Sequence, residues 1–208
     1  MSTKFLRRYT DLPALFYLLS ERKITLLDPS SWDDSNDAHY MNLYREKKDL
    51  KCVLAVCFTQ TAETYHHWRV FAGGSSGVCI RFRRLDLINA LKRQPGLKAK
   101  SIRYLTLPKI QGMRMKVGDL PFLKRYPFEQ EKEFRIIYES RHKKLAKLDV
   151  AIALSCIHRI TVSPWMDYSL FRHVKRTIRS IKGCNTLEVV RSTLIGNQQW
   201  KKLGESAQ

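Results

Sequence analysis

Two glutamates separated by one residue offer the clearest acid–base chemistry in the sequence. Glu131 and Glu133 lead directly into Phe134 and Arg135. In an extended chain, residues i and i+2 point to the same face, so we expect the two carboxylates side by side with Arg135 next in line. Repulsion between them raises the pKa of one carboxylate, whereas a nearby arginine lowers it. Such a pair suits general-base work or a hydrogen bond to a sugar hydroxyl, and a charged strand edge is the alternative on spacing alone.

Basic side chains form two further groups that suit phosphate binding. The first group recurs at i, i+3, i+4 and i+7 on a predicted helix over 167–182, away from its apolar face. A basic ridge on a rigid helix can contact phosphates, although an ordinary solvated helix face has the same pattern. This ridge consists of Arg172, Lys175, Arg176 and Arg179. The second group, just after a predicted strand at 134–138, consists of Arg141, Lys143, Lys144 and Lys147.

Other chemistry-bearing patterns are weaker. Trp68 precedes a Gly-Gly-Ser-Ser-Gly segment at 73–77, and an aromatic ring beside free backbone N–H groups could hold a flat ring and a phosphate. The segment follows neither the Walker phosphate-binding motif nor the glycine fingerprint of dinucleotide-binding folds, so it more simply predicts a turn. His66 and His67 are neighbours and point in different directions. The five cysteines form no Cys-x-x-Cys pair, which favours reduced thiols and no zinc site; we expect no metal.

The net charge of +19 points to a polyanionic partner. It is unevenly distributed: residues 1–70 hold 10 basic and 9 acidic side chains, whereas residues 71–208 hold 28 and 10. A field this asymmetric attracts phosphate backbones at long range. We therefore expect nucleic acid or a ribonucleoprotein as partner, with an acidic protein, a lipid surface or a merely basic soluble protein as alternatives. The sequence does not determine the oligomeric state.

No part of the sequence predicts membrane insertion or export. No apolar run approaches the roughly 20 residues that a membrane-spanning helix needs. Residues 1–8 are polar and basic, and Leu12 to Leu19 form an amphipathic pattern interrupted by Pro13, which is unlike a signal peptide. We expect a cytoplasmic protein that does not contact membranes.

The elements that must position these residues are strands and helices in irregular alternation. Asp11 and Pro13 mark the start of the first helix. Strands outnumber helices, which predicts a single α+β domain over 1–208, with about 197–208 as a candidate for disorder. Strands are predicted at 5–10, 24–27, 51–58, 78–82, 101–105, 134–138, 159–162 and 187–190. Helices are predicted at 12–19, from about 38 to 48, and at 65–72, 85–93 and 167–182.

The order of these segments resembles a bacterial family, the domain-of-unknown-function family 2971, over nearly the whole chain. The most specific match is a Glu-x-Glu-x-Arg signature at Glu131, Glu133 and Arg135. A family loop of sequence Phe-Asn-Asp-Pro-x-Glu resembles residues 32–37, where Asp34 is identical. Further similar segments are Arg8–Tyr9, 11–27, Val53–Phe58, Trp68, Gly77–Ile80 and Ile160–Ile181.

This layout is in turn similar to ADP-ribosyltransferases, including those that modify nucleic acid. The resemblance implies a split, mostly antiparallel sheet around an NAD cleft. It implies that Glu133 is the catalytic glutamate, which bonds a ribose hydroxyl and stabilises a positively charged transition state. It implies that Glu131 orients or deprotonates the acceptor. Arg8 and Tyr9 would then hold the dinucleotide, and Trp68 would pack against it.

Three functional hypotheses follow. The first is an NAD-dependent ADP-ribosyltransferase-like enzyme that acts on nucleic acid or a ribonucleoprotein, in phage defence or a related conflict. The second is a non-catalytic nucleic-acid-binding module that uses the basic helix at 167–182. The third is a nuclease that uses Asp34, Asp37 and the two glutamates with a divalent metal.

Overall fold

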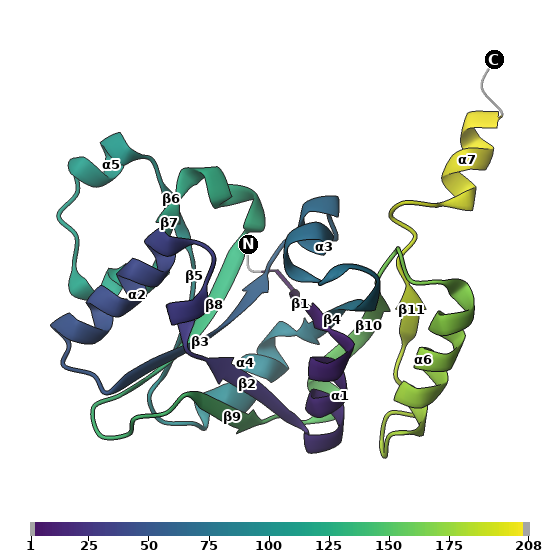
Figure 1. Cartoon of the computed structure of the whole chain (residues 1–208), viewed down its shortest axis with the longest axis horizontal. Coiled ribbons are helices and arrows are strands. Elements are labelled where there is room, and N and C mark those ends of the chain that lie inside the picture. The colour runs from purple at the N-terminus through teal and green to yellow at the C-terminus, as the bar shows by residue number, and fades with distance from the viewer. Residues whose placement is uncertain (1–2, 206–208) are drawn as a thin grey trace.

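The chain folds around one large mixed β-sheet (Figure 1). A computed structural model describes residues 3–205, and nine strands of this part form the sheet while two short strands form a separate parallel pair. The strands of the large sheet are β1 (Phe5–Asp11), β2 (Lys23–Leu27), β3 (Cys52–Thr59), β4 (Gly77–Arg83), β5 (Leu97–Ser101), β8 (Glu133–Ser140), β9 (Lys147–Ala151), β10 (Ile157–Val162) and β11 (Val189–Arg191). The separate pair is β6 (Arg103–Leu105) and β7 (Leu123–Arg125).

The large sheet is almost entirely antiparallel and is split. Its order is β11-β10-β4-β1-β3-β2-β9, with β8 paired to β3 and β5 paired to β8, and only β10 and β11 run parallel in it. β8 follows one edge of β3 along its whole length. The other edge of β3 is shared, because β1 pairs with it at Thr59 and β2 pairs with it at Ala55. The prediction of an α+β fold with a mostly antiparallel sheet is confirmed.

The five predicted helices begin within about three residues of their predicted starts, whereas the helices over 107–111 and 198–205 were not predicted. The carboxylate of Asp11 accepts a hydrogen bond from the backbone N–H of Ala14 at 2.8 Å and caps the first helix. Asp167 caps the helix Tyr168–Ser180 in the same way. The helices are α1 (Leu12–Glu21), α2 (Ser35–Lys47), α3 (Tyr65–Phe71), α4 (Arg84–Lys92), α5 (Leu107–Gln111), α6 (Tyr168–Ser180) and α7 (Gln198–Glu205).

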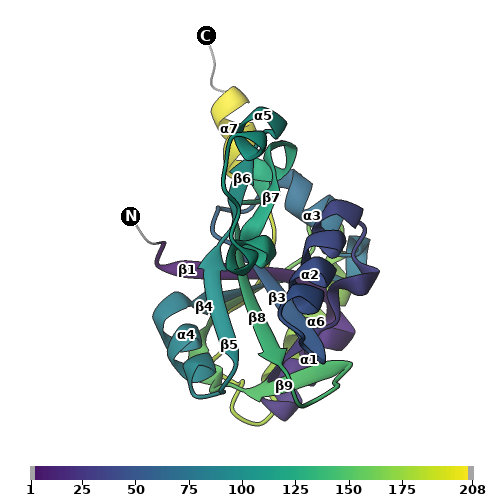
Figure 2. The same cartoon turned by 90° about the vertical axis from the view of Figure 1, so that its left-hand side faces the viewer.

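The two faces of the sheet carry different cores, because neighbouring side chains of a strand point to opposite faces. On one face, the main core collects apolar side chains from α1, α4 and α6. On the other face, Met41 and Tyr44 of α2 pack in one small core, and Trp68 of α3 packs with Tyr9 in another. Figure 2 shows α4 on the opposite side of the strands from α2 and α3.

The apolar stripe of α6 differs by one position from the predicted one. The heptad-like pattern predicts Leu170, Val174, Ile178 and Ile181 as the inward face. In the structure Leu170 is 58% exposed, whereas Phe171 is 8% exposed and Ile178 is fully buried. The larger aromatic ring therefore takes the inward position at the start of the helix, and α6 ends at Ser180, before the predicted end at 182.

Two edge strands were missed by the sequence analysis. β5 and β9 contain lysines beside apolar residues, a composition that blunts exposed sheet edges and weakens the strand signal. The predicted strand at 101–105 instead corresponds to the end of β5 and to β6.

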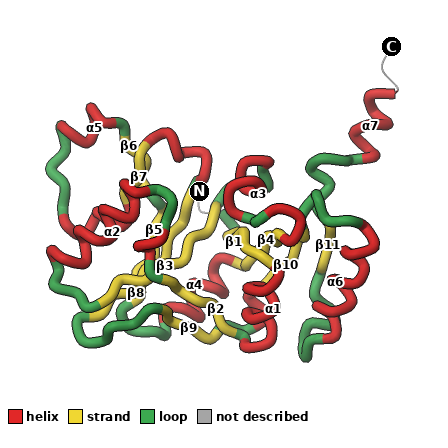
Figure 3. Tube along the Cα trace, viewed as in Figure 1, coloured by secondary structure: helices red, strands yellow, loops and turns green. Residues whose placement is uncertain are grey.

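The C-terminal segment that was a candidate for disorder contains α7, which projects from the rest of the fold on a loop after β11 (Figure 3). Residues 206–208 of that segment lie outside the described residues. Among residues 3–205, no helix is both long and apolar enough to cross a lipid bilayer.

Candidate active site

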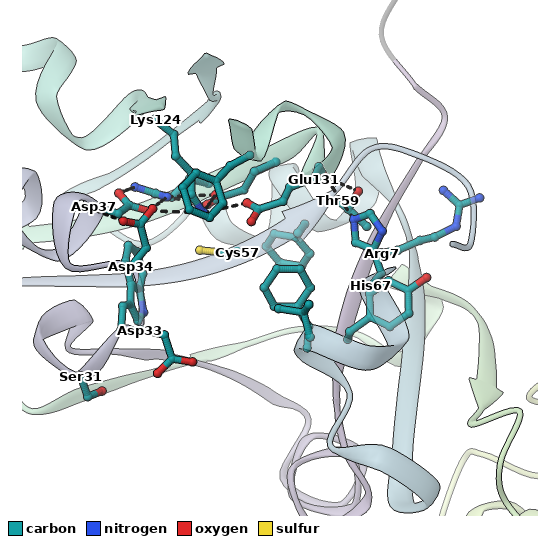
Figure 4. Close-up of a pocket in the computed structure, with 18 residues that line it drawn as sticks. Arg7, Ser31, Asp33, Asp34, Asp37, Cys57, Thr59, His67, Lys124 and Glu131 are labelled. Atoms are coloured by element: carbon teal, nitrogen blue, oxygen red, sulfur yellow. Dashed lines mark hydrogen bonds and ion pairs between the residues drawn. The ribbon is translucent and has the colours of Figure 1, made fainter. Parts of the chain in front are cut away.

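An open cavity of about 400 Å³ lies between α2 and α3, on the face of the sheet that carries the two small cores. Its volume is in the range of ligand and cofactor sites. Figure 4 shows Asp33 and Asp37 on one side of it and Arg7 and His67 on the other. Glu131 and Glu133 both line this cavity. Residues far apart in the chain therefore meet the glutamate pair in one place.

The backbone route that brings the two glutamates together differs from the predicted one. Glu131 ends a 3₁₀ helix (Tyr126–Glu131), and Lys132 takes a left-handed conformation with φ of 44° before β8 starts at Glu133. The prediction that Glu131 and Glu133 lie at positions i and i+2 of one extended segment is therefore wrong. Two side chains contact the backbone carbonyl oxygen of Glu131 and fix this turn. The Thr59 hydroxyl donates to this oxygen at 2.6 Å, and His67 Nε2 lies 3.3 Å from it.

Arg135 clamps two buried carboxylates at the base of the cavity. Its Nε and one terminal nitrogen donate to the two carboxylate oxygens of Glu133, at 2.7 and 3.0 Å. Its terminal nitrogens also donate to both oxygens of Asp37, at 2.7 and 2.6 Å. The Arg135 side chain is 1% exposed, and Trp32 covers its guanidinium with the ring centroid 4.7 Å away. This fork geometry fixes the orientation of both carboxylates.

Lys124 adds a second cation that connects all three carboxylates. Its Nζ lies 2.7 Å from Glu131 and 3.7 Å from both Glu133 and Asp37. The side chains of Lys124 and Glu131 are each 9% exposed. Three carboxylates and two cations thus form one buried network, and Lys124 ties Glu131 to it.

The network separates the proton affinities of the two glutamates. Burial raises the pKa of Glu131 above its ordinary value, against the opposing effect of Lys124. Burial acts in the same direction on Glu133, but Arg135 and then Lys124 outweigh it and leave the pKa of Glu133 below its ordinary value. Burial also raises the pKa of Asp37. Glu133 is therefore the fixed anion of the site, and Glu131 is the carboxylate that exchanges protons closer to neutral pH.

The α3 side of the cavity is aromatic. The Tyr9 ring stacks on His67 with centroids 5.4 Å apart and meets the buried Trp68 edge-on at 5.1 Å. Burial lowers the pKa of His67, which favours the neutral imidazole beside the Glu131 carbonyl. Phe71 and Phe128 also line the cavity, so flat rings find apolar walls there.

The predicted cofactor-binding residues take different positions. Tyr9 lines the cavity. Arg8 points to the other face of β1, where its guanidinium donates to the Thr25 carbonyl at 3.4 Å, and Arg7 lines the cavity in its place. Trp68 is fully buried behind Tyr9, and its indole N–H donates to Glu63 at 2.6 Å. It supports the cavity wall without lining it.

The predicted phosphate-binding groups lie away from the cavity. Arg172, Arg176 and Arg179 are exposed on α6, with Lys175 half-buried beside them, but α6 borders β11 at the opposite end of the sheet from α2 (Figure 1). At about 3.4 Å per residue, the far end of β8 lies roughly 25 Å from Glu133. Exposed side chains of the second basic group follow that end. These are Arg141, Lys143 and Lys144.

The acidic loop before α2 contributes structure and charge. Asp34 Oδ1 caps α2 by accepting from the backbone N–H groups of Asn36 and Asp37. Its Oδ2 is buried without a hydrogen-bond partner in the described part of the chain. In residues 3–205, no group of three or more His, Cys, Asp or Glu side chains is arranged to hold a metal ion. Asp37 and Glu133 instead direct both of their oxygens to Arg135.

The sequence analysis missed Arg7, Thr59, His67 and Lys124 as site residues. Arg7 could have been predicted from the sequence, because Arg7 and Tyr9 are two residues apart in a strand and their side chains share a face. The other three reach the cavity only through the fold, and no local signal marks them.

No known family model matches the chain, so its assignment to the domain-of-unknown-function family 2971 is not confirmed. No curated protein matches it. DarT from Thermus sp. 2.9 in complex with ADP-ribosylated ssDNA is similar at 12% identity and a TM-score of 0.48, over 92% of this chain and 95% of that one. The same protein in complex with NAD+ gives 12% identity and 0.47, over 92% and 96%.

Proposed function

We propose that this protein is an NAD-dependent ADP-ribosyltransferase that acts on nucleic acid, with the cavity between α2 and α3 as its active site. The observation that supports this most is the pair Glu131 and Glu133, which line one cavity with pKa values displaced in opposite directions. Two carboxylates with separated proton affinities are the arrangement expected for one electrostatic and one acid–base role. The biological setting that we propose for this activity is phage defence or a related conflict.

The side chains of the cavity fit a dinucleotide. Phe71, Phe128 and Tyr9 offer walls for flat rings, and the half-buried Arg7 offers a cation to a pyrophosphate. Lys124 is committed to the three carboxylates. One terminal nitrogen of Arg7 donates to the Thr61 carbonyl at 2.6 Å, and the other donors of this guanidinium can serve the ligand. When bound, NAD supplies an ADP-ribosyl group through cleavage of the bond between nicotinamide and ribose.

Each glutamate has a separate task in this proposal. Glu133 keeps its negative charge because Arg135 binds both of its oxygens. Each oxygen retains lone pairs that can accept a hydrogen bond from a ribose hydroxyl. A fixed anion at this position stabilises positive charge that develops on the sugar. Glu131 accepts the proton of the acceptor group. Thr59 and His67 are positioning residues, because they hold the backbone of Glu131.

The proposal is tested by nicotinamide release. The purified protein is incubated with NAD alone and with single-stranded DNA, RNA or cell protein, and free nicotinamide is measured over time. We expect release that is stimulated by nucleic acid. Release that is stimulated only by protein would contradict the proposed acceptor, and no release in any mixture would contradict the transferase activity.

The pH dependence of transfer should identify Glu131 as the proton acceptor. The base must be ionised to act, so the rate should rise with pH through the pKa of Glu131, which burial places above the ordinary glutamate value. In Glu131→Gln, we expect a lower rate of transfer that no longer rises with pH in the acidic part of the profile, the acidic limb. Initial rates from pH 4 to 8 on the two proteins provide the check. An unchanged acidic limb in the variant would assign the proton to another group.

A further inference from the structure

One cross-strand row connects the candidate active site to a line of arginines. Glu133 lies opposite Thr59 across β8 and β3, and Thr59 lies opposite Arg7 across β3 and β1. The row continues from Arg7 to Arg81 on β4 and from Arg81 to Arg159 on β10. Residues directly opposite in antiparallel strands point to the same face. The three arginines therefore lie on the cavity face, in single file, about 4.8 Å apart from strand to strand.

This row is electrostatically unfavourable in the free protein. Like charges directly opposite each other destabilise a sheet. Burial, followed by the charges of Arg159 and Arg7, lowers the pKa of Arg81. Glu188 is the carboxylate that ion-pairs with the row, 3.5 Å from Arg159, and its side chain is 51% exposed.

Hydrogen bonding leaves donors of the row available. Arg81 Nε donates to His158 Nδ1 at 3.2 Å, and the Phe5 ring lies 4.9 Å from its guanidinium. Arg159 Nε is buried and has no hydrogen-bond partner within residues 3–205. A row of three half-buried arginines is the arrangement in which an external anion would offset the repulsion between them.

We propose that Arg81 and Arg159 form a phosphate track that holds a single strand of nucleic acid and leads it past Arg7 into the cavity. This inference rests on the proposed function in taking nucleic acid as the acceptor. It places the acceptor strand on β4 and β10, away from both basic groups that the sequence analysis singled out on α6 and after β8.

The shape of the row favours a thin chain over a flat surface. All three arginines are half-buried on the sheet, so a lipid bilayer cannot approach them as closely as an extended strand can. Their single-file order matches successive phosphates of one backbone, and guanidinium groups bind phosphate oxygens in a bidentate manner. The row ends at Arg7, which lines the cavity that the proposed function assigns to NAD.

Oligonucleotide binding without NAD tests the track. The double variant Arg81→Gln/Arg159→Gln is compared with Lys92→Gln/Arg93→Gln, which removes equal charge from exposed positions at the end of α4. Fluorescence anisotropy of a labelled single-stranded oligodeoxynucleotide is measured over a salt series. We expect the track variant to bind about tenfold more weakly or worse, with the salt slope lower by roughly 1.4 for two lost phosphate contacts. The α4 variant should bind within about threefold of the wild type, since it loses only long-range attraction.

Several outcomes would overturn this inference. One is equal weakening in both double variants, because diffuse charge would then explain the binding. Others are a loss confined to Arg176→Gln/Arg179→Gln on α6, or unchanged oligonucleotide binding with weakened binding to phosphatidylserine vesicles. Each variant is first checked for a wild-type melting transition; if the double variant does not fold, Arg159→Gln alone is used. Since no NAD is present, a failure of transfer would refute the proposed function and leave this result standing.

Discussion

Glu133→Gln is expected to lower the rate of ADP-ribosyl transfer by roughly a hundred- to a thousandfold. The substitution keeps the size of the side chain and removes the anion that Arg135 fixes at the cavity base. Without this charge, positive charge that develops on the sugar has no fixed counterpart. Single-turnover rates at saturating NAD measure the effect.

Glu129→Gln is the matched control for this variant. Glu129 lies in the same 3₁₀ helix as Glu131, but its side chain is 41% exposed and pairs with Lys132 at 3.2 Å. We expect its transfer rate to stay within about twofold of the wild type, since an exposed pair contributes little. Equal rates for Glu133→Gln and Glu129→Gln, in proteins with the same melting transition, would remove Glu133 from the chemistry.

Arg135→Met should destabilise the fold by about 3–5 kcal/mol at pH 7, because it leaves two buried carboxylates without their main cation. Glu133 and Asp37 each lose two hydrogen bonds, and the Pro121 carbonyl loses one at 2.9 Å. Lys124 remains, at 3.7 Å from each carboxylate. The free energy of unfolding is obtained from urea denaturation.

The pH dependence of this loss distinguishes charge from packing. In the variant, the carboxylates bind protons more tightly in the folded state than in the unfolded one, so the folded variant gains stability as the pH falls. The destabilisation should therefore be smaller at pH 5 than at pH 7. Arg103→Met, at a 55% exposed arginine 4.0 Å from Asp119, should cost less than about 1 kcal/mol at either pH. A loss in Arg135→Met as small as this control would contradict the clamp.

Local patterns predicted the elements that have strong periodicity. The cap at Asp11, the alternation in β4 and the basic face of α6 all depend on neighbours in sequence, so they were visible without a structure. The three residues of the Glu-x-Glu-x-Arg signature, Glu131, Glu133 and Arg135, line one cavity. Even so, the predicted extended backbone between the two glutamates was wrong, because Lys132 takes a left-handed conformation that a lysine rarely adopts.

The partners of the glutamates depend on strand register and on contacts between distant segments. Asp37 is 98 residues from Arg135, and Thr59 reaches Glu131 across 72 residues. No periodicity relates such positions. The arginine row likewise depends on the register of β1, β4 and β10, which sequence spacing does not specify. Arg8 was preferred to Arg7 on the family resemblance, although strand alternation places Arg7 on the face of Tyr9.

We propose that the protein transfers an ADP-ribosyl group from NAD to nucleic acid in this cavity. The most direct test is the mass of a purified single-stranded oligonucleotide, DNA or RNA, after incubation with NAD and the wild-type protein. We predict a product heavier by one ADP-ribosyl group, absent without NAD and strongly reduced with Glu133→Gln. Oligonucleotides of unchanged mass, from protein that binds them and remains folded, would contradict the claim.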